Sequence, residues 1–161
     1  MAEEIEKLAI KEKLVRGCKV FTIDTRPLYK ATKISQYNRS EFGRYISRVD
    51  AVAKMNNLLT VGDAVSGYLS GQKLSMTASY YAAQEFNLRL LKEAIYKDIQ
   101  ISHWNIQTIA SKSEREDFRE FVENLILNEG QSIETMFNRR KHMTKFFQAA
   151  TKKGWVDANP L

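Results

Sequence analysis

Apolar residues recur at three- and four-residue steps along most of the chain, a spacing that places them on one face of an α-helix. The clearest example follows Ser132, whose hydroxyl can cap the first turn. Its predicted inner face consists of Ile133, Met136, Phe137, Arg140, Thr144 and Phe147. Gly154 suits the left-handed residue that ends a helix, and Trp155 can fold back onto the apolar face. We therefore expect a long helix with one face for a core and another for an anion.

Three further helices are predicted before it. One runs from a Thr60 cap to Gly71, and one covers residues 77–95. The third opens with a capping box at Ser113–Glu116 and turns Phe118, Phe121, Val122 and Leu125 to one side. In the helix over residues 77–95 the inward set is Tyr81, Leu88, Leu91 and Ile95, and the outward set is Gln84, Asn87, Arg89 and Lys92.

The first 58 residues have a mixed pattern. It predicts a helix over residues 2–16, a strand over residues 19–23 and a turn over residues 24–27. Residues 28–34 fit a short strand or an irregular basic segment equally well. Residues 40–58 keep a helical period, with Phe42, Ile46 and Val49 on the inner face. We expect a division into an N-terminal segment, residues 1–58, and a helical domain, residues 59–161.

The net positive charge of the chain indicates which class of partner it binds. The net charge is +6 and the pI is near 9.4, which favours a nucleic acid or another polyanion. Residues 1–58 carry a net +5, and in the remainder the positive charge gathers in the last helix. Cys18 is the single cysteine, so neither a disulfide framework nor a cysteine-based zinc site is expected. Without a signal peptide or a membrane-length apolar run, we expect a cytoplasmic protein with no membrane partner.

The final stretch resembles a known family. Asn138-Arg139-Arg140, the Phe146-Phe147 pair, Lys152-Lys153-Gly154 and the closing Asn159-Pro160-Leu161 are similar to the end of the core-binding domain of tyrosine recombinases, the phage integrases. The resemblance covers residues 60–161, with Thr77 and Tyr81 where that family often opens its second helix. It implies a mainly α fold, a SAM-like four-helix core-binding domain that binds duplex DNA beside other recombinase protomers. Residues 1–58 are similar to the arm-binding domains of some integrases, and the alternative is a helix-strand cap on the helical domain.

The catalytic groups of that family are not expected in this chain. The resemblance places them after Asn-Pro-Leu. In that family the histidine lies in a His-x-x-Arg sequence. Here His142 is followed three residues later by Lys145 instead of Arg, and His103 does not lie in such a sequence either. There is no Gly-rich phosphate loop, and we expect no metal and no cofactor. Two alternatives remain: a free-standing helical DNA-binding regulator, and a protein-interaction module whose basic faces meet an acidic partner.

The candidate DNA-binding residues are the cationic and amide side chains on the polar faces, because such groups hold phosphates and read base edges. They are Asn138, Arg139, Lys141, His142 and Lys145 on the last helix, Gln84, Asn87, Arg89 and Lys92 on the helix over residues 77–95, and Arg39, Arg44 and Arg48 near the start. The alternative for each set is that its side chains are only solvated and bind no DNA. Arg140 lies on the apolar stripe, where the aliphatic part of its side chain can pack against the core instead.

Overall fold

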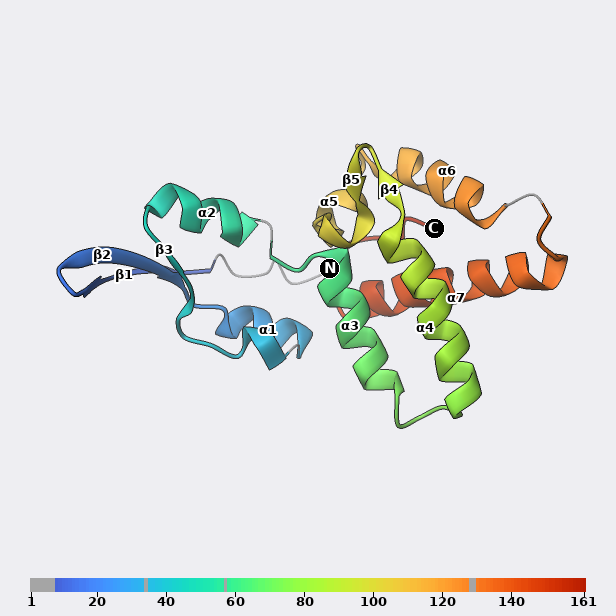
Figure 1. Ribbon diagram of the computed structural model, residues 1–161, viewed down its shortest axis with the longest axis horizontal. Helices are drawn as coiled ribbons and strands as arrows, with labels where there is room; N and C mark the ends of the chain where they lie inside the picture. Colours follow the sequence, from blue (N-terminus) through green and yellow to red (C-terminus); the bar gives the residue numbers. More distant parts are fainter. Residues whose placement is uncertain (1–7, 34, 57, 128–129) are drawn as a thin grey trace. The chain divides into compact units, whose positions relative to one another are not determined.

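The computed structural model describes residues 8–33, 35–56, 58–127 and 130–161 (Figure 1). Within these ranges the protein is mainly α-helical, with seven α-helices, a three-stranded antiparallel sheet and a two-stranded antiparallel ribbon. The chain divides into two compact units, one ending at Leu58 and the other running from Leu59 to Leu161. The expectation of a mainly α fold is confirmed, and the three-stranded sheet of the first unit exceeds the strand content that was predicted.

The sheet of the first unit has the order β1-β2-β3, built from β1 (Ile10–Val15), β2 (Cys18–Ile23) and β3 (Phe42–Tyr45). Arg16 and Gly17 join the first two strands with φ values of 51° and 80°, as a two-residue hairpin turn requires. The strand predicted over residues 19–23 is confirmed. The helix predicted over residues 2–16 is wrong from residue 8 onward, because pairing with β2 overrides a weak local pattern; residues 2–7 lie outside the described ranges.

Two helices complete this unit. The undecided segment is helical, in α1 (Arg26–Thr32), which is followed by η1 (Ser35–Tyr37). The helix predicted over residues 40–58 is confirmed only in α2 (Arg48–Asn56), since Gly43 at φ 70° belongs to β3. Ile46 and Val49 are consequently 89 % and 77 % exposed instead of buried. The described core of the unit includes Leu8, Ile23, Leu28, Tyr37, Ala51 and Leu58.

The second unit consists of helices around a long central one. Its elements are α3 (Val61–Gln72), α4 (Ala78–Glu93), β4 (Ile95–Tyr96), β5 (Ile99–Gln100), η2 (Ile101–His103), α5 (Ile106–Ile109), α6 (Arg115–Ile126) and α7 (Ile133–Lys152). Two predicted N-caps are confirmed, Thr60 in a capping box with Asp63 and Ser132 at the start of α7, and Thr77 caps α4. Helix α7 packs against α3, α4 and α6 (Figure 1).

The buried face of α7 differs from the predicted one. It consists of Arg139, His142, Met143, Phe146, Phe147 and Ala150. Ile133 and Phe137 of the predicted face are 83 % and 63 % exposed. Relative to the predicted orientation, α7 is rotated about its axis by one residue step, roughly 100°. The cause is the packing of Phe146 on Tyr68 and of Phe147 on Phe118, with ring centroids 5.5 and 5.6 Å apart. The predicted helix end is confirmed, with Gly154 at φ 76° and Trp155 1 % exposed.

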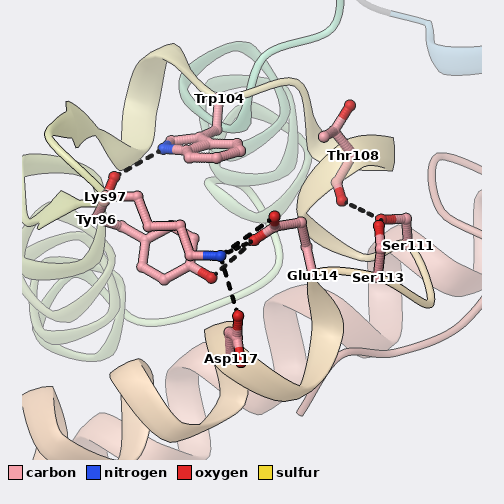
Figure 2. Close-up of polar contacts among 8 residues, drawn as sticks. All are labelled: Tyr96, Lys97, Trp104, Thr108, Ser111, Ser113, Glu114 and Asp117. Atoms are coloured by element: carbon pink, nitrogen blue, oxygen red, sulfur yellow. Dashed lines mark hydrogen bonds and ion pairs between the residues drawn. The ribbon is translucent and has the colours of Figure 1, made fainter.

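A hairpin of β4 and β5 is fastened to the start of α6 (Figure 2). Lys97 Nζ lies 2.9 Å from Glu114 Oε2 and 3.0 Å from Asp117 Oδ2. The Tyr96 hydroxyl donates to Glu114 Oε2 at 2.9 Å, and Trp104 Nε1 donates to the Tyr96 carbonyl at 3.2 Å. The helix predicted to reach residue 95 therefore ends at Glu93, and Ile95 is 60 % exposed instead of inward.

The capping box predicted at Ser113–Glu116 is wrong. Helix α6 begins at Arg115, and its N-terminus has no side-chain cap. Ser113 Oγ instead lies 3.2 Å from Ser111 Oγ (Figure 2). The carboxylate of Glu114 is occupied by the hairpin, so the local cap is replaced by a contact between distant parts of the chain.

Replacing Tyr96 by Phe removes one hydrogen bond from this fastening and leaves the ring in place. We expect Y96F to lower the free energy of unfolding by about 1.5 kcal/mol, the lower end of the range for a hydrogen bond to a charged group, because Glu114 keeps its contact with Lys97. Urea unfolding measures it. Y81F is the matched control, because the Tyr81 hydroxyl makes no hydrogen bond to a described residue. Equal stability losses in the two variants would contradict the assignment.

Candidate nucleic-acid interface

A cationic surface forms where the first turn of α4 meets the middle of α7. Lys141 and Lys145 are four residues apart and share one side of α7. Tyr80 reaches them from α4, with its ring centroid 5.4 Å from Lys141 Nζ and 5.9 Å from Lys145 Nζ. Lys145 Nζ also donates to the Tyr80 hydroxyl at 3.3 Å. Asn138 precedes Lys141 by three residues, so it lies on the same side; we call these four residues the α7 lysine face.

The charge of this face is not neutralised within the unit. Neither Lys141 nor Lys145 forms an ion pair with any residue in the described ranges. The one acid of α7, Glu134, lies in the first turn of the helix, seven residues before Lys141. Two cations held beside one phenol ring favour an anion between them, and the phenol can donate a further hydrogen bond. A phosphate group has the charge and the acceptor atoms that such an arrangement suits.

Beneath the face lies a buried histidine. His142 is 3 % exposed, and its Nδ1 lies 2.7 Å from Asn87 Nδ2. Since an amide nitrogen only donates, Nδ1 is the acceptor and the imidazole is neutral. The Tyr80 ring meets it edge-on at 5.4 Å. Burial, followed by the charges of Lys141 and Lys145, lowers the pKa of His142. His142 therefore supports Tyr80 from below and does not itself reach the surface.

Four predicted DNA-binding residues are buried. Gln84 is fully buried and donates from Nε2 to the Tyr68 hydroxyl at 2.6 Å. Asn87 is occupied by His142, and Arg139 is 7 % exposed with no hydrogen-bond partner for its Nε. The outward placement expected for Gln84, Asn87, Arg139 and His142 is therefore wrong. The rotation of α7 explains the burial of Arg139 and His142. On α4, Gln84 and Asn87 are buried because they form hydrogen bonds with side chains of the neighbouring helices α3 and α7.

The remaining predicted residues are accessible but lie apart. Arg89 follows Tyr80 by nine residues, which turns it to the other side of α4, and it faces Glu85 at 3.7 Å. Lys92 is partly exposed. The last three, Arg39, Arg44 and Arg48, are exposed in the first unit. Among the accessible predicted residues that the structure describes, Asn138, Lys141 and Lys145 thus share one surface.

Tyr80 is the member of the site that sequence reasoning missed. Its position three residues after the Thr77 cap gave a weak signal, because a residue of the first turn lies near the helix end. Its partners are more than sixty residues away in the chain. Only the crossing of α4 and α7 makes the ring part of the site.

Comparisons with protein-family models, with curated protein sequences and with solved structures gave no match. Within the described ranges, every helix is too short or too polar to cross a membrane. No group of three His, Cys, Asp or Glu side chains that could hold a metal ion is found among the described residues. The geometry of the α7 lysine face therefore carries the functional argument.

The depressed pKa of His142 makes stability depend on pH. The unfolded chain takes up this proton more readily than the folded one, so stability is complete above the unfolded pKa of about 6.5 and falls as pH drops below it. Urea unfolding between pH 7.5 and pH 5.5 should show this fall. H142Q should flatten the dependence, whereas H103Q, at an exposed histidine, should leave it unchanged. Equal dependence in both variants would refute the role given to burial.

Proposed function

We propose that this chain is the DNA-binding, non-catalytic N-terminal region of a tyrosine recombinase. The second unit would be the core-binding domain, with α3, α4, α6 and α7 as its four main helices. The sequence resemblance over residues 60–161 and the order of these helices support the proposal. The Asn-Pro-Leu end packs on α6, where Arg119 Nε donates to the Pro160 carbonyl at 3.0 Å.

The observation that carries the proposal is the α7 lysine face. Lys141 and Lys145 present two uncompensated charges on one helix side, and Asn138 adds an amide that could pair with an adenine edge. In the proposed complex the lysines and the Tyr80 hydroxyl hold phosphates of duplex DNA, which positions α7 on the backbone. The chain would grip DNA without cutting it, since a buried, neutral His142 is not available to a phosphodiester.

Two other functions follow from the same charge. A free-standing DNA-binding regulator would show the same binding behaviour and differs in having no recombinase domain encoded with it. A protein-interaction module would use the lysine face for an acidic protein and would show no affinity for duplex DNA at low salt. The contact of Lys141 and Lys145 with the Tyr80 ring favours the two DNA-binding functions, because it holds both ammonium groups close together.

Removing Lys141 and Lys145 tests the proposed interface. Each phosphate contact releases condensed counterions, so the double variant K141A/K145A should flatten the slope of log affinity against log salt by roughly 1.8, or 0.9 per contact. Fluorescence anisotropy with a labelled duplex, repeated at several salt concentrations, measures this slope.

The control for that experiment is R89A/K92A, which removes the same charge from the side of α4 away from Tyr80. Circular dichroism should show that both variants keep their helices, because all four side chains reach solvent. An unchanged slope in K141A/K145A would exclude the lysine face as the DNA contact. A chain that binds no duplex DNA at low salt would instead support the acidic-partner reading.

The first unit is proposed to add a separate DNA contact through Arg39, Arg44 and Arg48. If it does, the triple alanine variant should give a shorter footprint on duplex DNA than the unaltered chain. The control K30A/K33A/K54A removes three exposed cations from the same unit, and its footprint should keep its length. Footprints of equal length in the two variants would show that the arginines are only solvated.

A further inference from the structure

The N-terminal part of the apolar stripe predicted on α7 is exposed to solvent. Ile133 and Phe137 are 83 % and 63 % exposed, and Leu127 at the end of α6 is 56 % exposed. Single exposed apolar residues are common on protein surfaces, whereas a group of large ones marks a contact site. We infer from the packing of α6 and α7 that these three residues lie near one another.

The two helices run antiparallel, because Phe118 packs on Phe147 while Glu123 bonds to Arg140. The ion pair is bidentate, at 2.8 and 2.7 Å, and it lies on the outer surface. Leu127 is one turn beyond Glu123 on α6, and Phe137 is nearly one turn before Arg140 on α7. The two side chains therefore reach the same level of the helix pair, and Ile133 continues the line by one more turn.

The rim of this group is acidic. Glu116 and Glu120 precede Glu123 at helical spacing, so the three glutamates form a row on α6 that leads to Leu127. Glu116 and Glu120 are exposed and form no ion pair within the part of the chain that the structure describes. We call Glu116, Glu120, Leu127, Ile133 and Phe137 the α6–α7 outer face. It combines an apolar line with uncompensated negative charge.

We propose that the α6–α7 outer face binds an amphipathic helix of a partner protein, with Leu127, Ile133 and Phe137 against the apolar side of that helix and Glu116 and Glu120 against its Lys or Arg residues. A line of exposed apolar side chains along two packed helices suits a third helix, which presents apolar side chains at the same three- and four-residue spacing. The glutamate row selects a basic partner and repels nucleic acid and anionic lipid. This inference goes beyond DNA binding and does not depend on it.

A synthetic peptide tests the proposal on the full chain. The probe is a fluorescein-labelled helix of about five turns with leucine on one side and lysine on the other; a second peptide carries glutamate in place of every lysine. Anisotropy should show binding of the lysine peptide and at least about tenfold weaker binding of the glutamate peptide. F137S and E120K should each weaken the lysine peptide by about tenfold, as loss of a central anchor or of charge complementarity does.

Three controls make the result specific. F86S alters an exposed phenylalanine of α4 outside the face and should leave peptide binding unchanged. K145A should also leave it unchanged, so that peptide binding and DNA binding are separated. Lysine-peptide affinity unaltered in both F137S and E120K would overturn the proposal. So would sedimentation showing a dimer that F137S converts to monomer, because a second copy would then cover the face.

Discussion

Burial of two adjacent phenylalanines on α7 is the constraint on which the second unit depends. Phe146 meets Tyr68 of α3 edge-on, and Phe147 meets Phe118 of α6, so one helix holds neighbours on two sides. Their rings also pack on each other at 4.9 Å. Once these rings are buried, the rotation of α7 about its axis is settled. Lys141 and Lys145 then reach the surface beside α4, while the start of the helix extends past the packed region.

Polar pairs lie beside this aromatic packing. Gln84 bonds to Tyr68 and Asn87 bonds to His142, both between buried side chains. A buried polar group left without a partner is costly, so such pairs favour one alignment of α3, α4 and α7 over others. The cost of burying polar groups in this unit is not fully offset, since Gln84 Oε1 and Arg139 Nε have no hydrogen-bond partner among the described residues. The pair at His142 lies directly under Tyr80 and so links helix packing to the geometry of the lysine face.

Charge is segregated within the second unit. Residues 59–161 carry a net charge of only +1, yet α7 presents a cationic side and α6 a row of carboxylates. Glu123 and Arg140 neutralise each other where the two helices meet, whereas Glu116 and Glu120 form no ion pair with any described residue. Two surfaces of opposite character on one small helical unit suit two different partners. A total charge cannot reveal this, because the two contributions nearly cancel.

The sequence by itself determined the elements whose signals are local. The caps at Thr60 and Ser132 and the end at Gly154 were predicted, because each depends on a hydroxyl or a backbone preference within a few residues. Contacts between distant segments select which side of a helix is buried and which segments pair as strands. On α7 two apolar lines overlap, and contacts from α3 and α6 select the one that also buries Arg139 and His142. The strand β3 and the site residue Tyr80 likewise depend on partners distant in the chain. The strand β1 depends on pairing with β2 across a hairpin turn, which its own helix-like pattern does not record.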